Sequence, residues 1–266
     1  MKQNKAFSGP ALGLSVLTAA LADAAAPAGS VRTALLSGLL NAAVLSALIL
    51  LAGAFWQRSQ AFRLAWMTAL PLWLLAELAR TVLQAHAVCR EEFRSMALLG
   101  VLPLLLWAGG QLAPGSWNAA ARVLWWMVFL GIVLCLPGLL GQMHWARLVA
   151  ADAARPARSV QVFVYAEYFF GPPLCAGKTP KHLLGLPWLS FAVRAAAWLG
   201  MGLVFGAGDY PQRELLRAWN AGVFSRLDAL LLLVWLACAF YRIGFLCTAL
   251  RTCLCGTAPA GKGAAE

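Results

Sequence analysis

Long apolar segments constrain this chain more than any other feature. Its 266 residues hold roughly eight such segments, separated by short polar stretches. The clearest run from Ala34 to Trp56 and from Leu227 to Leu250, each close to the ~20 residues that a helix needs to cross a bilayer. Hydrophobic residues make up 62% of the chain and charged residues only 12%, which leaves too little polar surface to coat a soluble domain of this size. We therefore expect an all-α polytopic membrane protein.

The apolar segments cover about 9–27, 33–56, 64–88, 96–112, 121–141, 160–177, 184–207 and 227–250. Their hydrophobicity is continuous, which favours spanning helices over the alternating strands of a membrane β-barrel. We expect one transmembrane domain over 1–252, with a short interfacial helix over 211–219 that starts at Pro211, and a disordered tail over 253–266. The first residues also resemble a cleavable signal peptide, but the many spans that follow favour retention.

The charge distribution narrows the possible partners. The formal net charge of +11 is spread singly or in pairs over nearly every loop, as expected for anchoring to anionic lipid headgroups and not for binding nucleic acid. We find no paired metal ligands, no Ser/His/Asp arrangement and no phosphate-binding loop. The sequence therefore predicts no metal, no cofactor and no enzymatic activity.

Two of the apolar segments are interrupted. Pro10, Gly13 and Asp23 interrupt the first, and Gly171-Pro172-Pro173 interrupts the sixth. A broken membrane helix must find partners for its freed backbone groups, and breaks five helices apart fit the substrate site of an inverted-repeat transporter. The alternative is that Gly and Pro are simply common in membrane helices. We favour a site in which the backbone at Gly9-Pro10 and at Gly171 cradles a carboxylate.

Acidic residues inside the segments add to this site. Glu167 lies just before the break in the sixth segment, and a charge at membrane depth costs ~2.5–3.5 kcal/mol on insertion scales. We expect it to meet a ligand ammonium or carry a proton, with Tyr165 nearby; the alternative is a structural pairing with an arginine such as Arg242. Glu77 is a further candidate, although Arg80 is three residues away on the same helix face and favours a local ion pair.

The most specific pattern begins at Tyr210. It comprises Tyr210-Pro211-x-x-Glu214-Leu215-x-Arg217, then Phe224-Ser225-Arg226-Leu227-Asp228 and Trp235. This pattern resembles the signature of the spore germination permease family, which supplies the B-type membrane subunit of nutrient germinant receptors within the amino acid–polyamine–organocation superfamily. Weaker similarities include Ser8-Gly9-Pro10, which looks like the break of the first helix, and Glu167, which takes the place of a glutamate often seen in the sixth.

The resemblance implies about ten helices in a five-plus-five inverted repeat, an amino acid or similar nutrient as ligand, and other receptor subunits as partners. This sequence departs from the family in three ways: it stops after the eighth segment, it has little chain before Gly9, and it has Ser225 where the family has Glu. We therefore expect an incomplete form of that fold, which senses a nutrient in the spore inner membrane with transport as a secondary property. We expect the ligand between segments 1, 3, 6 and 8. The alternatives are a structural subunit that stabilises partners without binding a ligand, and a free-standing amino acid permease.

Overall fold

The computed structural model describes residues 7–24, 30–94, 96–154, 162–170, 181–205 and 227–255. The expected all-α fold is confirmed for this part of the chain, which forms helices and no strand. The elements are α1 (Gly9–Asp23), α2 (Val31–Arg58), α3 (Gln60–Glu92), α4 (Ala97–Gln111), α5 (Pro114–Leu140), α6 (Trp145–Ala154), the 3₁₀ helices η1 (Ala166–Phe169) and η2 (Lys181–Gly185), α8 (Leu186–Phe205) and α10 (Leu227–Cys255).

Within the described residues, five helices are long and apolar enough to cross a membrane. They are Val31–Arg58, Gln60–Glu92, Pro114–Leu134, His182–Phe205 and Leu230–Cys255. Large apolar side chains are exposed on these helices, among them Leu36, Leu40, Leu72, Leu83 and Trp126, as expected for surfaces that face lipid. The chain is therefore an integral membrane protein. The first and fourth predicted segments form shorter helices of 15 residues each, α1 and α4.

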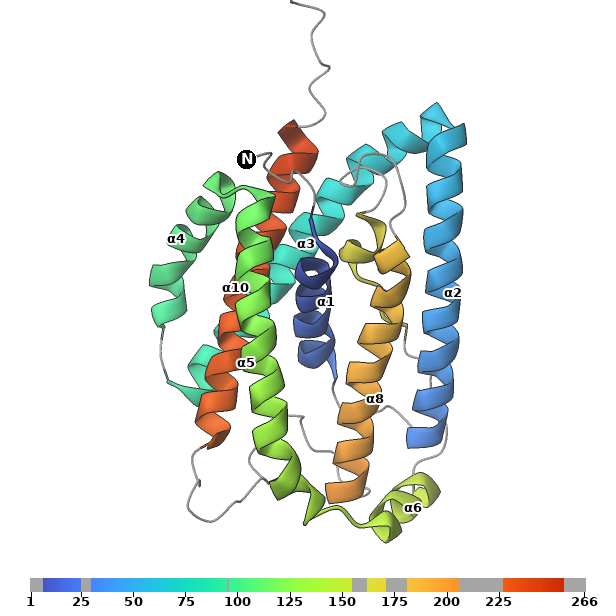
Figure 1. The fold of residues 1–266 in the computed structure, drawn as a ribbon, viewed down its shortest axis with the longest axis vertical. Helices are drawn as coiled ribbons and strands as arrows, with labels where there is room; N and C mark the ends of the chain where they lie inside the picture. Colours follow the sequence, from blue (N-terminus) through green and yellow to red (C-terminus); the bar gives the residue numbers. More distant parts are fainter. Residues whose placement is uncertain are drawn as a thin grey trace, which may run out of the picture.

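Helix α1 lies in the middle of the bundle (Figure 1). It packs against α5 and α10 on one side and against α8 on the other, while α2 lies outside α8 and α6 crosses the end of α8. All ten residues from Ala11 to Ala20 are buried. Helix α10 contacts α1, α3, α4 and α5. A short apolar helix is thus enclosed by longer ones, so its polar side chains can bond only to protein groups.

The first predicted break is instead the start of a helix. Helix α1 begins at Gly9, and the Ser8 Oγ accepts a 3.4 Å hydrogen bond from the Ala11 N–H. Pro10 lies in the first turn, where its missing N–H removes no helical hydrogen bond. Gly13 is buried within the continuous helix. The expectation of an interruption at Pro10 and Gly13 is therefore wrong within the described residues, because Ser8-Gly9-Pro10 is an N-terminal capping sequence.

The described part of the sixth segment is not a spanning α-helix. Residues 162–165 have no regular structure, and a single 3₁₀ turn follows at η1. Tyr165 is extended, with φ −114° and ψ 144°. The Phe163 carbonyl accepts a 3.2 Å hydrogen bond from the Asn41 side chain on α2 instead of a helical N–H. This segment is therefore unwound earlier than the sequence suggested; Gly171 lies outside the described residues.

Helix α10 approaches its neighbours closely at two glycines. A Cβ at Gly109 on α4 would lie 2.8 Å from the Gly244 carbonyl oxygen, and a Cβ at Gly244 would overlap the Trp117 ring on α5. The Trp117 ring is held in place, since its Nε1–H donates a 2.7 Å hydrogen bond to the Thr248 Oγ1 and its edge packs against Tyr241. Small residues at helix contacts allow this close backbone approach in membranes.

We predict that Gly244→Ala destabilises the protein by about 1–3 kcal/mol, the usual cost of overpacking a core. The added methyl group would have to displace a ring that is hydrogen-bonded and buried. Thermal unfolding of the detergent-purified protein measures the effect. Gly100→Ala on α4 is the matched control, because a Cβ at Gly100 would meet nothing within 4 Å. Equal melting temperatures for the two variants would contradict this packing.

Candidate functional site

A buried arginine joins two glutamates at the centre of the bundle. Arg242 on α10 is 1% exposed, and its Nη2 lies 3.0 Å from the Glu77 Oε2 on α3 and 3.0 Å from the Glu167 Oε1 on η1. Its Nε donates to the same Glu167 oxygen at 3.1 Å, and its Nη1 donates to the Thr81 Oγ1 at 2.9 Å. Ser15 on α1 completes the group with a 2.6 Å hydrogen bond from its Oγ to the Glu167 Oε1. We call these five residues the Arg242 cluster.

The cluster holds one more acid than base. Two carboxylates and one guanidinium, all ionised, give a net charge of −2 + 1 = −1 in a region closed to water. Two carboxylates close together in such a region favour uptake of one proton or one cation. The Glu167 Oε2 is buried and has no hydrogen-bond partner among the described residues. This oxygen is therefore an open acceptor in the cluster, to which an ammonium group could donate.

The predicted ion pair between Glu77 and Arg80 does not form. The structure pairs Glu77 with Arg242, and Arg80 with Asp23 at the end of α1, at 2.7 Å. The Arg80 side chain is about half exposed, whereas Glu77 is buried. Residues three apart on a helix are neighbours, but the deeper Arg242 offers Glu77 a partner in the region where a carboxylate costs most. Glu167 also takes Arg242, which is the pairing we named as its alternative.

A second buried arginine lies on α8. Arg194 is 1% exposed, and its Nη1 donates a 3.1 Å hydrogen bond to the Tyr165 hydroxyl. Tyr165 in turn donates to the Asp23 Oδ2 at 3.1 Å. The Tyr168 hydroxyl donates to the Ser190 Oγ at 2.6 Å. We call residues 162–170 the η1 segment. Its tyrosines therefore connect α8 to the end of α1.

Both tyrosines remain protonated donors. The usual pKa of a tyrosine hydroxyl is about 10, so both groups are neutral near pH 7. A neutral hydroxyl can accept from Arg194 and donate to Asp23 at the same time, which a phenolate could not. Tyr165 thus carries a hydrogen-bonded connection between a buried cation and a carboxylate.

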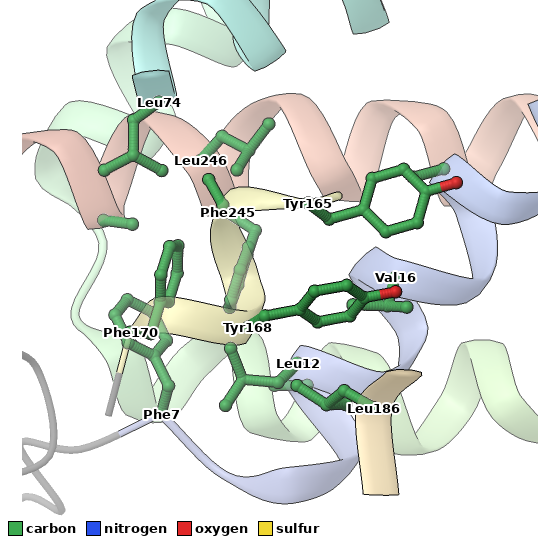
Figure 2. Close-up of a cluster of buried hydrophobic side chains, with 14 of the residues drawn as sticks. Phe7, Leu12, Val16, Leu74, Tyr165, Tyr168, Phe170, Leu186, Phe245 and Leu246 are labelled. Carbon is green, nitrogen blue, oxygen red and sulfur yellow. The ribbon is translucent and has the colours of Figure 1, made fainter. Parts of the chain in front are cut away.

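Aromatic packing keeps the η1 segment in its unwound form. Figure 2 shows the Tyr165 and Tyr168 rings extending from one side of the segment and Phe170 lying on the other. The Phe170 ring stacks on Phe245 of α10 with centroids 6.0 Å apart, and Phe7 packs edge-on against Phe245 at 4.7 Å. Buried rings on both sides stabilise a segment that has few backbone hydrogen bonds of its own.

The structure brings together some of the predicted site residues and separates others. Glu77 and Glu167 belong to the Arg242 cluster, and Tyr165 is buried beside it. Gly9 and Pro10 lie at the other end of α1, where the Pro10 carbonyl accepts a 2.9 Å hydrogen bond from Trp125, and Glu167 meets Ser15 in the middle of the helix. The predicted carboxylate cradle at Gly9-Pro10 is therefore not beside Glu167.

Most of the family-like pattern lies outside the described residues. This applies to Tyr210, Pro211, Glu214, Arg217 and Arg226, and to the interfacial helix expected at 211–219. Asp228 lies in the first turn of α10, as we expected for an acidic residue near a helix N-terminus. Trp235 is half-buried on α10 and packs against a small cluster that includes Ala85, Leu98 and Ala239. Helix α10 continues through Cys255, so the first residues of the expected tail are helical.

Sequence reasoning missed Ser15, Thr81, Asp23 and Arg194 as members of the site. Arg194 carried a usable signal, because it is a lone charge in the middle of an apolar segment, the position at which membrane helices are functional by default. Ser15 and Thr81 had none, since hydroxyl residues are common in membrane helices and bond to their own backbone. Among the residues that the structure covers, no group of His, Cys, Asp or Glu could hold a metal ion.

Comparison of the chain with models of protein families, with curated proteins and with solved structures gave no match.

We predict that Arg242→Met destabilises the protein by about 3–5 kcal/mol, because it leaves two buried carboxylates without a cation. The triple variant Arg242→Met/Glu77→Gln/Glu167→Gln should regain much of this loss, since it removes the stranded charges as well. Thermal unfolding in detergent and the fraction of monodisperse protein measure both effects. Arg90→Met serves as the control on an exposed arginine. A triple variant no more stable than the single variant would contradict the charge balance described here.

Proposed function

We propose that this chain is the membrane subunit of a spore nutrient germinant receptor, which senses an amino acid or a similar small nutrient at Glu167. The Tyr210–Trp235 pattern supports the type of receptor. The observation that supports the place of binding is the Arg242 cluster, in which a buried glutamate on an unwound segment keeps one carboxylate oxygen free of hydrogen bonds among the described residues.

The arrangement of the four segments supports a ligand site. We expected the ligand between segments 1, 3, 6 and 8, and these correspond to α1, α3, the η1 segment and α10. Ser15, Glu77, Glu167 and Arg242 provide one side chain from each. An unwound segment beside a buried charge is the arrangement by which membrane proteins bind small charged molecules.

The charge balance supports a cationic group on the ligand. The ammonium of an amino acid would bring the net charge of the Arg242 cluster from −1 to 0, and a proton would do the same. Arg242 already holds Glu167 through two nitrogens, so an arriving ammonium competes with it. In this proposal, bound nutrient weakens the contact between α10 and the η1 segment and favours a second arrangement of the two.

The proposal extends to the arrangement and number of the spanning helices. Helix α1 and the η1 segment would be the first helices of two inverted halves, and the described helices would belong to a set of about eight spans. The partners would be other receptor subunits in the spore inner membrane. The proposed role of this chain is recognition of the nutrient, with residual transport as a second property. Neither requires a catalytic step.

We predict that Glu167→Gln abolishes the response to nutrient while the protein still assembles. The amide keeps the size of the side chain and can still accept a hydrogen bond from Arg242, but it cannot balance an ammonium. Germination of spores that carry the variant, over a series of amino acid concentrations, is the direct measurement. Glu91→Gln, an exposed glutamate at the end of α3, is the matched control. An unchanged dose response in Glu167→Gln spores would remove Glu167 from the site.

A structural subunit is the second candidate function. Its support is that Arg242 already binds both carboxylates, so the cluster needs no ligand to be stable. In that case purified protein binds no amino acid at millimolar concentration, yet deletion of the gene lowers the level of a partner protein. A free-standing permease, the third candidate, requires amino acid counterflow in liposomes that contain this chain alone.

A further inference from the structure

The second buried arginine has an unused binding edge. Arg194 is 1% exposed, but the Arg242 cluster does not include it. Its partners among the described residues are neutral: the Tyr165 hydroxyl, the Ser190 Oγ and the Phe163 ring. Within the same residues no carboxylate forms an ion pair with it. A buried guanidinium without a direct counterion is costly, which calls for an explanation.

The free part of Arg194 is the edge formed by Nε and Nη2. The Nε has no hydrogen-bond partner among the described residues, and the contact of Nη2 with the Ser190 Oγ is long, at 3.5 Å. These two nitrogens point in the same direction and form a fork that matches the two oxygens of a carboxylate. In Arg242 the same edge is occupied, since Nε and Nη2 both donate to Glu167.

The guanidinium of Arg194 is also held in a fixed orientation. Its central carbon lies 3.9 Å from the centroid of the Phe163 ring, and its Nη1 donates to Tyr165. The ring sets the plane of the group and the hydroxyl sets its rotation in that plane. An arginine fixed in this way loses little freedom when it binds an anion.

The acid that is linked to Arg194 through Tyr165 is engaged elsewhere. Asp23 reaches Arg194 only through the Tyr165 hydroxyl, and its other oxygen binds Arg80 and the Gln84 amide. Asp23 therefore compensates the charge of Arg194 at a distance and leaves the Nε–Nη2 edge unfilled. This combination of a fixed, buried cation with a free two-donor edge is typical of anion recognition.

We propose that Arg194 binds the carboxylate of a small ligand through its Nε and Nη2, in the region between the η1 segment, α2 and α8. This inference rests on the proposed function, in which Glu167 receives the ammonium, and it assigns the opposite end of the same zwitterion. Tyr165 and Tyr168 lie on the same segment as Glu167 and bond to Arg194 and Ser190 of α8. Because Arg194 is sealed from solvent, the ligand enters when the η1 segment moves.

The test measures how tightly each common amino acid binds to the detergent-purified full chain. It also measures binding of the matching amino acid amide, which keeps the ammonium and lacks the carboxylate. For an amino acid that binds wild-type protein, we expect Arg194→Gln to weaken binding about 10- to 100-fold, the value of a hydrogen bond to a charged group. Arg194→Lys, which keeps the charge and loses the fork, should fall in between. The amide should bind wild-type protein as weakly as the acid binds Arg194→Gln. Arg90→Gln is the control.

The outcomes separate this inference from the proposed function. If Arg194→Gln binds the acid as well as wild type does, or wild type binds acid and amide equally, Arg194 is not the carboxylate site, while a loss of binding in Glu167→Gln would still support the proposed function. If Arg194→Gln alone loses binding, the carboxylate site stands and the role of Glu167 falls. If wild-type protein binds neither acids nor amides, both are overturned. Should Arg194→Gln fail to fold, the comparison of acid with amide on wild-type protein decides.

Discussion

The central constraint on this structure is the burial of Arg242 among apolar helices. A guanidinium out of reach of water needs an acceptor for each of its donor groups, or its burial costs several kcal/mol. Glu77, Glu167, Thr81 and Ser15 supply these acceptors from α3, the η1 segment and α1. Displacing α3, α10 or η1 would break an ion pair of the cluster, and displacing α1 would remove the Ser15 hydroxyl from Glu167 and Arg242. The cluster therefore fixes the relative positions of α1, α3, α10 and η1 more strictly than apolar contacts could.

The unwound segment before and within η1 acquires its role from this constraint. Its backbone makes few regular hydrogen bonds, and its side chains supply the compensation: Glu167 to Arg242, Tyr165 to Asp23, and Tyr168 to Ser190. Each of these bonds reaches a different helix. A segment held by side chains has a lower cost of rearrangement than a helix, because no ladder of backbone bonds must break. That property suits the proposed role of this segment as the part that moves when a ligand binds.

The apolar pattern predicted much of the fold. The segments expected at 33–56, 64–88 and 227–250 correspond to α2, α3 and α10, since hydrophobic length is a direct signal for a spanning helix. Prediction from the sequence was wrong where one local pattern is compatible with two structures. Ser8-Gly9-Pro10 was expected to break a helix and instead begins one, and Glu77 was expected to pair with Arg80 on its own helix and instead pairs with Arg242. A local helix cap decided the first outcome, whereas a contact with α10 decided the second.

The sequence by itself determined that this is an all-α membrane protein, and it indicated Glu167 as a carboxylate within an apolar segment that needs a partner. Those conclusions follow from composition and from the cost of desolvating a carboxylate, which do not depend on the arrangement of the helices. Tertiary structure alone decided which partner each charge takes, and that Arg194 keeps a free edge. Arg242 is 75 positions from Glu167 and 165 from Glu77, and only the packing of α1, α3, α10 and the η1 segment brings such distant residues within hydrogen-bond distance.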